Sequence, residues 1–223
     1  MIMRMIDVKA LLQEYQDSNR KWLSSTVTEE LLVRLKEGSQ DVIIIGFGGT
    51  ISSGYSPTRE TIIPLDHSPA KKEIEYINNF KISDIRYSEI RLCAKDSREL
   101  MKEDFFTLLT TLEYLSGKKI LITCGTYLLP KISELILSFE FQNTSIAVTG
   151  SILPAGFLGS DASQNIWSAI TILLHTNNFT GAIFHGRTFT TISALHDLNL
   201  HPKETENMVI QYPLSTIPVD GIL

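Results

Sequence analysis

The sequence predicts an α/β protein built on a doubly wound, mostly parallel sheet. Residues 42–45 are Val-Ile-Ile-Ile, and such an unbroken apolar, β-branched run is typical of a strand covered on both faces. Later apolar runs of strand length alternate with amphipathic helical segments, as in βαβ proteins. The chain has 223 residues, of which 43% are hydrophobic and 20% charged, so it can bury a full core.

Two amphipathic helices are expected before the first strand, over residues 7–22 and 27–36. Thr26 and Glu29 have the spacing of a capping box at the start of the second helix. We expect residues 1–40 to form a helical N-terminal extension that packs against the α/β domain or serves an oligomer.

The remaining elements follow in alternation after the strand at 41–45. Helices are expected at 69–80, 97–115, 130–137 and 165–174, and strands at 85–93, 119–123, 145–149 and 181–185. Between the first strand and the first of these helices, residues 52–68 are polar and rich in Pro, Gly, Ser and Thr. Such a long segment inside a compact domain favours a functional loop or lid.

Composition restricts the classes of ligand. The net charge of −5 and a pI near 5.6 give no electrostatic basis for binding nucleic acid or an acidic membrane. No apolar run is long enough to span a bilayer. The two cysteines, Cys93 and Cys124, lack the spacing of a metal site or a redox motif. We therefore expect a cytoplasmic protein that binds a small molecule and uses no metal or cofactor.

Polar residues follow four of the predicted strands. They are Thr50 after Gly48-Gly49, Asp96-Ser97, Gly125-Thr126, and Ser151 after Gly150. Because the carboxyl ends of parallel strands meet at one edge of a sheet, where ligands bind, these groups are expected to share one crevice. The alternative for each hydroxyl is a helix N-cap, which Ser97 in particular would suit. The alternative for Gly48-Gly49 is a tight strand exit.

The order of these motifs resembles the N-terminal domain of the bacterial-type L-asparaginase family, whose members are threonine amidohydrolases. The resemblance covers residues 41–223, with Phe47 in place of the first threonine of the T-G-G-T-I signature. The matching segments are 48–51 for that signature, 96–105 for D-S-S-x-M-T-P-x-D-W, 124–128 for H-G-T-D-T, 150–165 for G-A-M-R-P…A-D-G-P-x-N-L, and 213–217 for P-L-G-x-I.

The resemblance implies a role for each of several residues. Thr50 would be the nucleophile that attacks a side-chain carboxamide, and Thr126 the second hydroxyl of the site. Tyr55 would stand in for the lid tyrosine, and Ser97 would hold the substrate carboxylate. Further substrate contacts fall on Gly49, Asp96, Gly125, Tyr127 and Ser151. The resemblance also implies a homo-oligomer and a small amide or carboxylate ligand.

The chain departs from the family where the nucleophile is activated. Family members place an Asp after the second threonine and a Lys on a later strand, but here Tyr127 takes the Asp position and residues 181–199 supply no matching lysine. Tyr127 would either line a pocket for a ligand without an α-amine or fill a disused pocket. His185 and His196 are candidate bases, with His185 the better placed at the end of a strand, although a histidine at a strand end is more often structural. The resemblance covers only the first domain of the family, so we expect no counterpart of the smaller C-terminal domain.

Two functions are therefore predicted. One is an amidohydrolase with a threonine nucleophile and weak or altered activity on asparagine or a related amide. The other is an inactive homologue that binds a small carboxylate or a protein partner. We keep both because the Asp and Lys with which family members activate the nucleophile are not found at the matching positions.

Overall fold

The computed structural model describes residues 7–200, apart from 57, 59–60, 66, 94–98, 140 and 199. At residues 55–56 and 61–62 it describes the backbone alone. Six strands form one sheet in the order β4-β1-β5-β6-β7-β8, and the first five run parallel. This confirms the predicted α/β class. The strands are β1 (Val42–Phe47), β4 (Tyr87–Cys93), β5 (Lys119–Cys124), β6 (Ser145–Thr149), β7 (Thr180–Phe184) and β8 (Arg187–Phe189).

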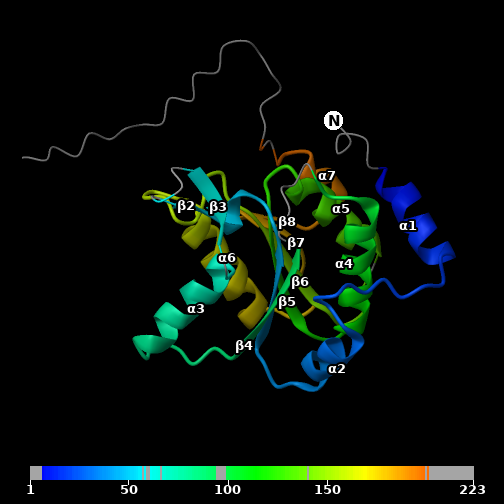
Figure 1. Cartoon of the computed structure of the whole chain (residues 1–223), viewed down its shortest axis with the longest axis horizontal. Coiled ribbons are helices and arrows are strands. Elements are labelled where there is room, and N and C mark those ends of the chain that lie inside the picture. The colour runs from blue at the N-terminus through cyan, green and yellow to red at the C-terminus, as the bar shows by residue number, and fades with distance from the viewer. Residues whose placement is uncertain are drawn as a thin grey trace, which may run out of the picture.

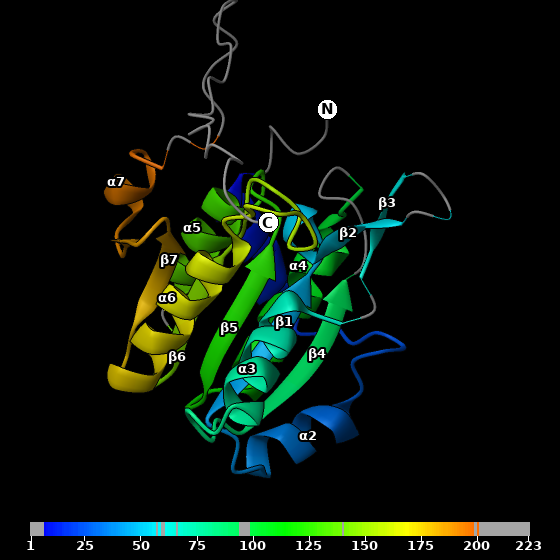
Figure 2. The ribbon, with the colours of Figure 1, turned by 90° about the vertical axis from the view of Figure 1, so that its left-hand side faces the viewer.

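Helices cover both faces of this sheet (Figures 1 and 2). The first face carries α4 (Lys102–Tyr114), α5 (Leu129–Phe139) and α7 (Ile192–Leu195), with α1 (Val8–Asp17) and α2 (Glu29–Glu37) in the same core. The second face carries α3 (Pro69–Asn79) and α6 (Ala162–His175). Strand β1 feeds both cores, because its side chains alternate: Ile43 and Ile45 pack on the first face, and Ile44 on the second.

The N-terminal helices pack into the first core. Helix α1 lies outside α4 and α5 (Figure 1), and Leu11, Leu12 and Tyr15 are buried there. The Tyr15 hydroxyl donates a hydrogen bond to Glu113 at 2.5 Å. The predicted N-cap is wrong by two residues: Thr28, and not Thr26, caps α2 by accepting a hydrogen bond from the Leu31 N–H. Helix α1 also ends five residues before the predicted boundary.

One crossover has the opposite hand to the others. The chain moves from β1 to β4 through α3 on the second face, and returns past β1 to β5 through α4 on the first face, so these two crossovers have the same hand. The β5-to-β6 connection through α5 runs along the sheet in the same direction as the one through α4 and lies on the same face. The β6-to-β7 connection through α6 also runs in this direction, but on the opposite face. Because nearly all such connections are right-handed, the β6-to-β7 crossover is the left-handed one.

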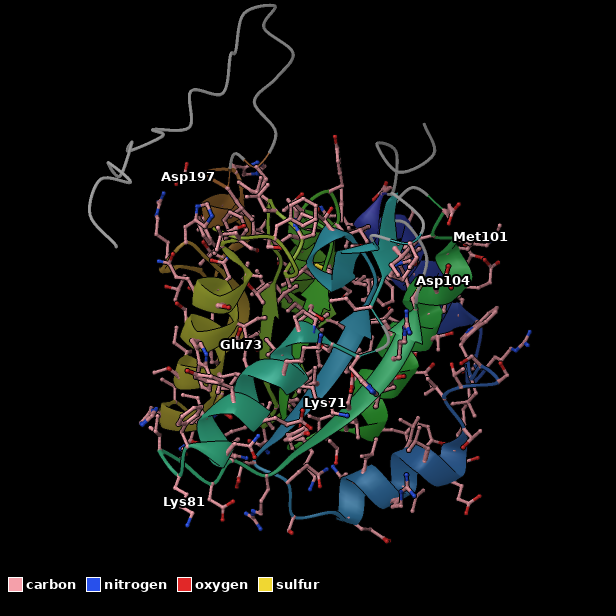
Figure 3. All side chains as sticks on the ribbon, turned by 60° about the vertical axis from the view of Figure 1, so that its left-hand side comes forward. Lys71, Glu73, Lys81, Met101, Asp104 and Asp197 are labelled. Atoms are coloured by element: carbon pink, nitrogen blue, oxygen red, sulfur yellow. The ribbon has the colours of Figure 1, made fainter. Side chains whose placement is uncertain are left out.

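The structure also differs from the prediction in residues 52–68 and at the start of α4. Residues 52–68, expected to be irregular, contain a hairpin of β2 (Ser53–Ser56) and β3 (Thr61–Pro64) that pair antiparallel. Helix α4 was expected from residue 97, but its N-cap is Met101, whose N–H donates to the Asp104 carboxylate at 2.8 Å (Figure 3). The alternative role of Ser97 as a helix cap falls outside the described residues. In the described part of the chain, no helix is both long and apolar enough to cross a membrane.

Candidate active site

The candidate site lies where the connections from β1 and β5 part. The chain leaves β1 toward α3 on one face, whereas it leaves the neighbouring β5 toward α5 on the other. Ligands of open α/β sheets bind at such a switch point, outside the carboxyl ends of the strands. Thr50 and Thr126 lie on either side of it, directly after β1 and β5. The fold thus brings the two predicted threonines to one edge of the sheet.

Gly49 allows these two strand ends to touch. Its φ of 82° and ψ of 178° belong to a region that is essentially reserved for glycine. A Cβ on Gly49 would lie 2.1 Å from the Gly125 nitrogen. The glycines predicted from the motifs therefore act by permitting backbone contact, and Gly48, with a φ of 68°, helps the chain turn out of β1.

Thr50 begins a short helical turn, η2 (Thr50–Ser52), that follows Gly48-Gly49. The turn is closed by hydrogen bonds from the Ser52 N–H to the Gly49 carbonyl and from the Ser53 N–H to the Thr50 carbonyl. Thr50 is half-buried, and Thr126 is 7% exposed. Neither hydroxyl has a hydrogen-bond partner among the residues that the structure describes, so both are available to a ligand.

The chain after β6 approaches the same place, but the proton of its hydroxyl group is not available to a ligand. A Cβ on Gly150 would lie 2.7 Å from the Cys124 carbonyl and 3.7 Å from the Thr126 nitrogen. The buried Ser151 hydroxyl donates to the Leu153 carbonyl at 2.5 Å and thereby closes its own turn. Ser151 thus has its proton engaged, and the predicted substrate contact at this residue is limited to accepting a hydrogen bond.

A hydrogen-bond network joins the ends of β6 and β7 to α6, and the sequence analysis did not predict it. The Asn165 amide, fully buried, donates to the Gly150 carbonyl at 2.9 Å and to Asp161 at 3.0 Å, and its oxygen accepts from the His185 N–H at 2.8 Å. The Asp161 carboxylate also accepts from the backbone N–H groups of Ile152 and Leu153. These contacts fix the β6–α6 loop. The signal that would have found them is the spacing of Asp161 and Asn165, one helical turn apart.

His185 is not placed to serve Thr50. Its Nε2 lies 2.9 Å from the Asp161 carboxylate, and its ring stacks on Phe184 at 4.1 Å. Strands β5 and β6 separate β7 from β1, and three strand spacings amount to roughly 14 Å. With a φ of 49° it also occupies an unusual backbone region, which favours a structural role at the end of β7.

The Tyr127 side chain lies largely at the surface. It follows Thr126 and is 61% exposed. Asp96, Ser97 and the Tyr55 side chain lie outside the described residues, so their predicted roles stay predictions; the backbone of Tyr55 pairs with Ile62 in the β2–β3 hairpin.

The Cys124 thiol does not compete with the threonines at the end of β5. Cys124 is fully buried, and burial raises the pKa of its thiol far above the usual range, which keeps it protonated and unreactive. The neighbouring Thr123 hydroxyl is buried without a partner in the described structure. Within the same described ranges, no three His, Cys, Asp or Glu side chains gather closely enough to hold a metal ion.

Comparison with known proteins agrees with this arrangement. The family model "Asparaginase, N-terminal" matches residues 41–195. A search of curated protein sequences returns no match.

Solved structures share the fold. They include L-asparaginase I from Vibrio cholerae, with 21% identity and a TM-score of 0.53 over 68% of this chain and 46% of that one. A probable cytoplasmic L-asparaginase from Campylobacter jejuni has 18% identity and a TM-score of 0.52 over 68% and 48%. The thermostable L-asparaginase from Thermococcus kodakarensis has 24% identity and a TM-score of 0.48 over 66% and 45%.

The chain spans about half the length of these structures. At such identities the Vibrio and Campylobacter structures show a shared fold, while the family model covers well over half of this chain. The protein therefore belongs to the asparaginase family, through the N-terminal domain of that family.

Proposed function

We propose that this protein hydrolyses a side-chain carboxamide, of asparagine or a related amide, with Thr50 as the nucleophile. One observation carries the proposal: two threonine hydroxyls without hydrogen-bond partners in the described structure flank the switch point between β1 and β5, whose ends touch at Gly49 and Gly125. Membership of the asparaginase family supports the same chemistry.

The reaction would proceed through an acyl-enzyme. The Thr50 oxygen adds to the amide carbon, its proton is transferred to the amide nitrogen, ammonia leaves, and water hydrolyses the resulting ester to release the carboxylate and restore the Thr50 hydroxyl. Thr126 would orient the amide, and backbone N–H groups of the glycine turns would stabilise the developing oxyanion. Tyr55, Asp96, Ser97 and Ser151 remain proposed contacts from the family resemblance.

The proposal predicts that Thr50→Ala abolishes ammonia release, because the variant has no nucleophilic oxygen. Ammonia is measured with L-asparagine and with L-glutamine. Thr50→Ser is the matched control, since it keeps the hydroxyl and is expected to retain measurable turnover. Melting temperatures establish that each variant is folded. Wild-type turnover in a folded Thr50→Ala protein would contradict the assignment.

A second function, a non-catalytic binding domain, is favoured by a different observation. Among the described residues, no imidazole, carboxylate or amine is hydrogen-bonded to the Thr50 hydroxyl, and a neutral hydroxyl needs a base to react. This function predicts no ammonia from any amide, together with thermal stabilisation by L-aspartate that is lost in Ser97→Ala.

We also propose a cytoplasmic location, homo-oligomerisation and a division of the chain into residues 1–40 and 41–223.

A further inference from the structure

Exposed apolar side chains border one side of the candidate site. They lie on the two loops that follow β5 and β6, and we call them the apolar rim: Tyr127, Ile152, Phe157 and Leu158. Tyr127 is 61% exposed and Leu158 is completely exposed. Large apolar side chains that gather around one site, in contrast to single exposed ones, indicate a binding surface.

The rim adjoins the two threonines. Tyr127 is the neighbour of Thr126 in sequence, and the β5 and β6 loops touch where Gly150 meets Cys124. The β6–α6 loop, which holds Ile152, Phe157 and Leu158, lies beside the β2–β3 hairpin that follows Thr50 (Figures 1 and 2). The loop leads from β6 to α6 on the second face, which also carries α3.

The same two loops offer no partner for a charged group. Residues 125–130 and 150–161 contain no lysine or arginine, and their one carboxylate is Asp161. Its oxygens already accept hydrogen bonds from Ile152, Leu153 and Asn165, and one lies 2.9 Å from His185 Nε2. An ammonium group bound on this side would lose water without gaining a counter-ion, which is unfavourable.

We propose that the natural substrate is an amide whose α-amine carries an apolar acyl or peptidyl group, and that this group packs on the apolar rim. The inference rests on the proposed function, because it places the carboxamide at Thr50 and Thr126. A substituted amine is neutral, so it needs no counter-ion on the β5 and β6 loops, and its apolar substituent covers side chains that otherwise face water.

The experiment compares L-asparagine with N-benzoyl-L-asparagine as substrates. Both release ammonia from the same side-chain amide, with the benzoyl group remaining attached to the product. We expect kcat/KM to be at least tenfold higher for the benzoyl compound. Benzoate release in place of ammonia would overturn the proposal, because the acyl bond would then be the one that is cleaved.

Variants test the rim directly. Tyr127→Ser and Leu158→Ser are each expected to reduce the preference for the benzoyl substrate at least threefold, measured as the ratio of the two kcat/KM values. Leu158 is fully exposed, so its substitution leaves the core intact. Tyr76→Ser is the matched control, since Tyr76 is a 60% exposed tyrosine on α3, away from the rim, and its ratio should equal that of the wild type.

Calorimetric binding of N-benzoyl-L-aspartate and of L-aspartate separates this inference from the hydrolase proposal. If neither amide releases ammonia but the benzoyl product binds at least tenfold more tightly, and Tyr127→Ser removes that difference, the proposed hydrolysis fails while the ligand class stands. If L-asparagine is hydrolysed and the benzoyl compound is no better as substrate or ligand, the hydrolysis stands and the inference is overturned. If neither amide is hydrolysed and neither product binds, both fail.

Discussion

At the scale of single residues, the site depends on a glycine that no other residue can replace. Gly49 has a backbone conformation that L side chains avoid, and its α-carbon faces the Gly125 backbone. The strain of such a conformation is of the order of 1–3 kcal/mol for a residue with a Cβ, and the overlap with Gly125 adds to it. The close approach of the strand ends that carry Thr50 and Thr126 therefore depends on the absence of a side chain at Gly49.

We expect Gly49→Ala to lower the free energy of unfolding by at least about 3 kcal/mol, because strain and overlap combine. The measurement is urea denaturation. Gly159→Ala is the control, since Gly159 has a φ of 77° but nothing within 4 Å of its Cβ position, and we expect it to cost about 1 kcal/mol. Equal losses in the two variants would show that the contact with Gly125 contributes nothing.

At the scale of elements, α6 holds the loop that precedes it. Asn165, near the start of the helix, is bonded to the Gly150 carbonyl after β6 and to the His185 N–H after β7. One buried amide thus fixes the ends of two neighbouring strands. Since Gly150 contacts the β5 turn, the position of the Thr126 loop depends on α6 as well.

Replacing Asn165 with Ala should remove these bonds and leave the buried Gly150 carbonyl and the partly buried His185 N–H without this partner. Such groups cost about 1–3 kcal/mol each, so we expect a loss of roughly 3 kcal/mol in the free energy of unfolding. Gln164→Ala, at the exposed adjacent position, should change it by less than about 0.5 kcal/mol. Chemical denaturation of both variants gives the comparison, and an unchanged midpoint for Asn165→Ala would refute the role.

At the scale of the whole molecule, an ion pair connects the starts of β1 and β4 at the end of the sheet opposite the site. Asp41, just before β1, accepts hydrogen bonds from the backbone N–H and the guanidinium of Arg86, the latter at 2.8 Å. The Asp41 backbone N–H in turn donates to the Arg86 carbonyl. Chiefly through the side-chain hydrogen bond, Arg86 holds the pKa of Asp41 below its ordinary value of 3.8.

This pair predicts a pH dependence of stability. Because the folded pKa of Asp41 is depressed, its contribution is complete above the unfolded value near 4 and is lost as the pH falls through the folded value. Asp41→Asn should therefore reduce the melting temperature at pH 7 and weaken the loss of stability below pH 4. Asp17→Asn, at an exposed position on α1, is the control. Identical acid profiles for Asp41→Asn and the wild type would rule out this contribution.

The N-terminal helices also concern the whole molecule. They were expected to form an extension of the α/β core, and α1 places Leu11, Leu12 and Tyr15 in the same apolar core as α4 and α5. Their amphipathic spacing was visible in the sequence. Which face of the sheet they would cover was not, because the pattern identifies an apolar face without identifying its partner.

The local elements could largely be predicted from the sequence, since apolar periodicity and glycines are local signals. The buried strand at 42–47, the alternating helices and the Gly-Gly-Thr turn all follow from residues that are adjacent in the chain. The hairpin within 53–64 was missed because its turn residues resemble those of a loop. The short antiparallel strand β8 was missed because three residues carry too little pattern.

The sequence by itself determined the fold class and named Thr50 and Thr126, because motif order and strand patterning are properties of the chain. Only the tertiary structure decided that Gly49 rests against Gly125, that Tyr127 is exposed, and that His185 binds Asp161 with two strands between it and β1. The reason is physical: strand order and the hand of each crossover depend on packing between distant segments, and these set which side chains share a site.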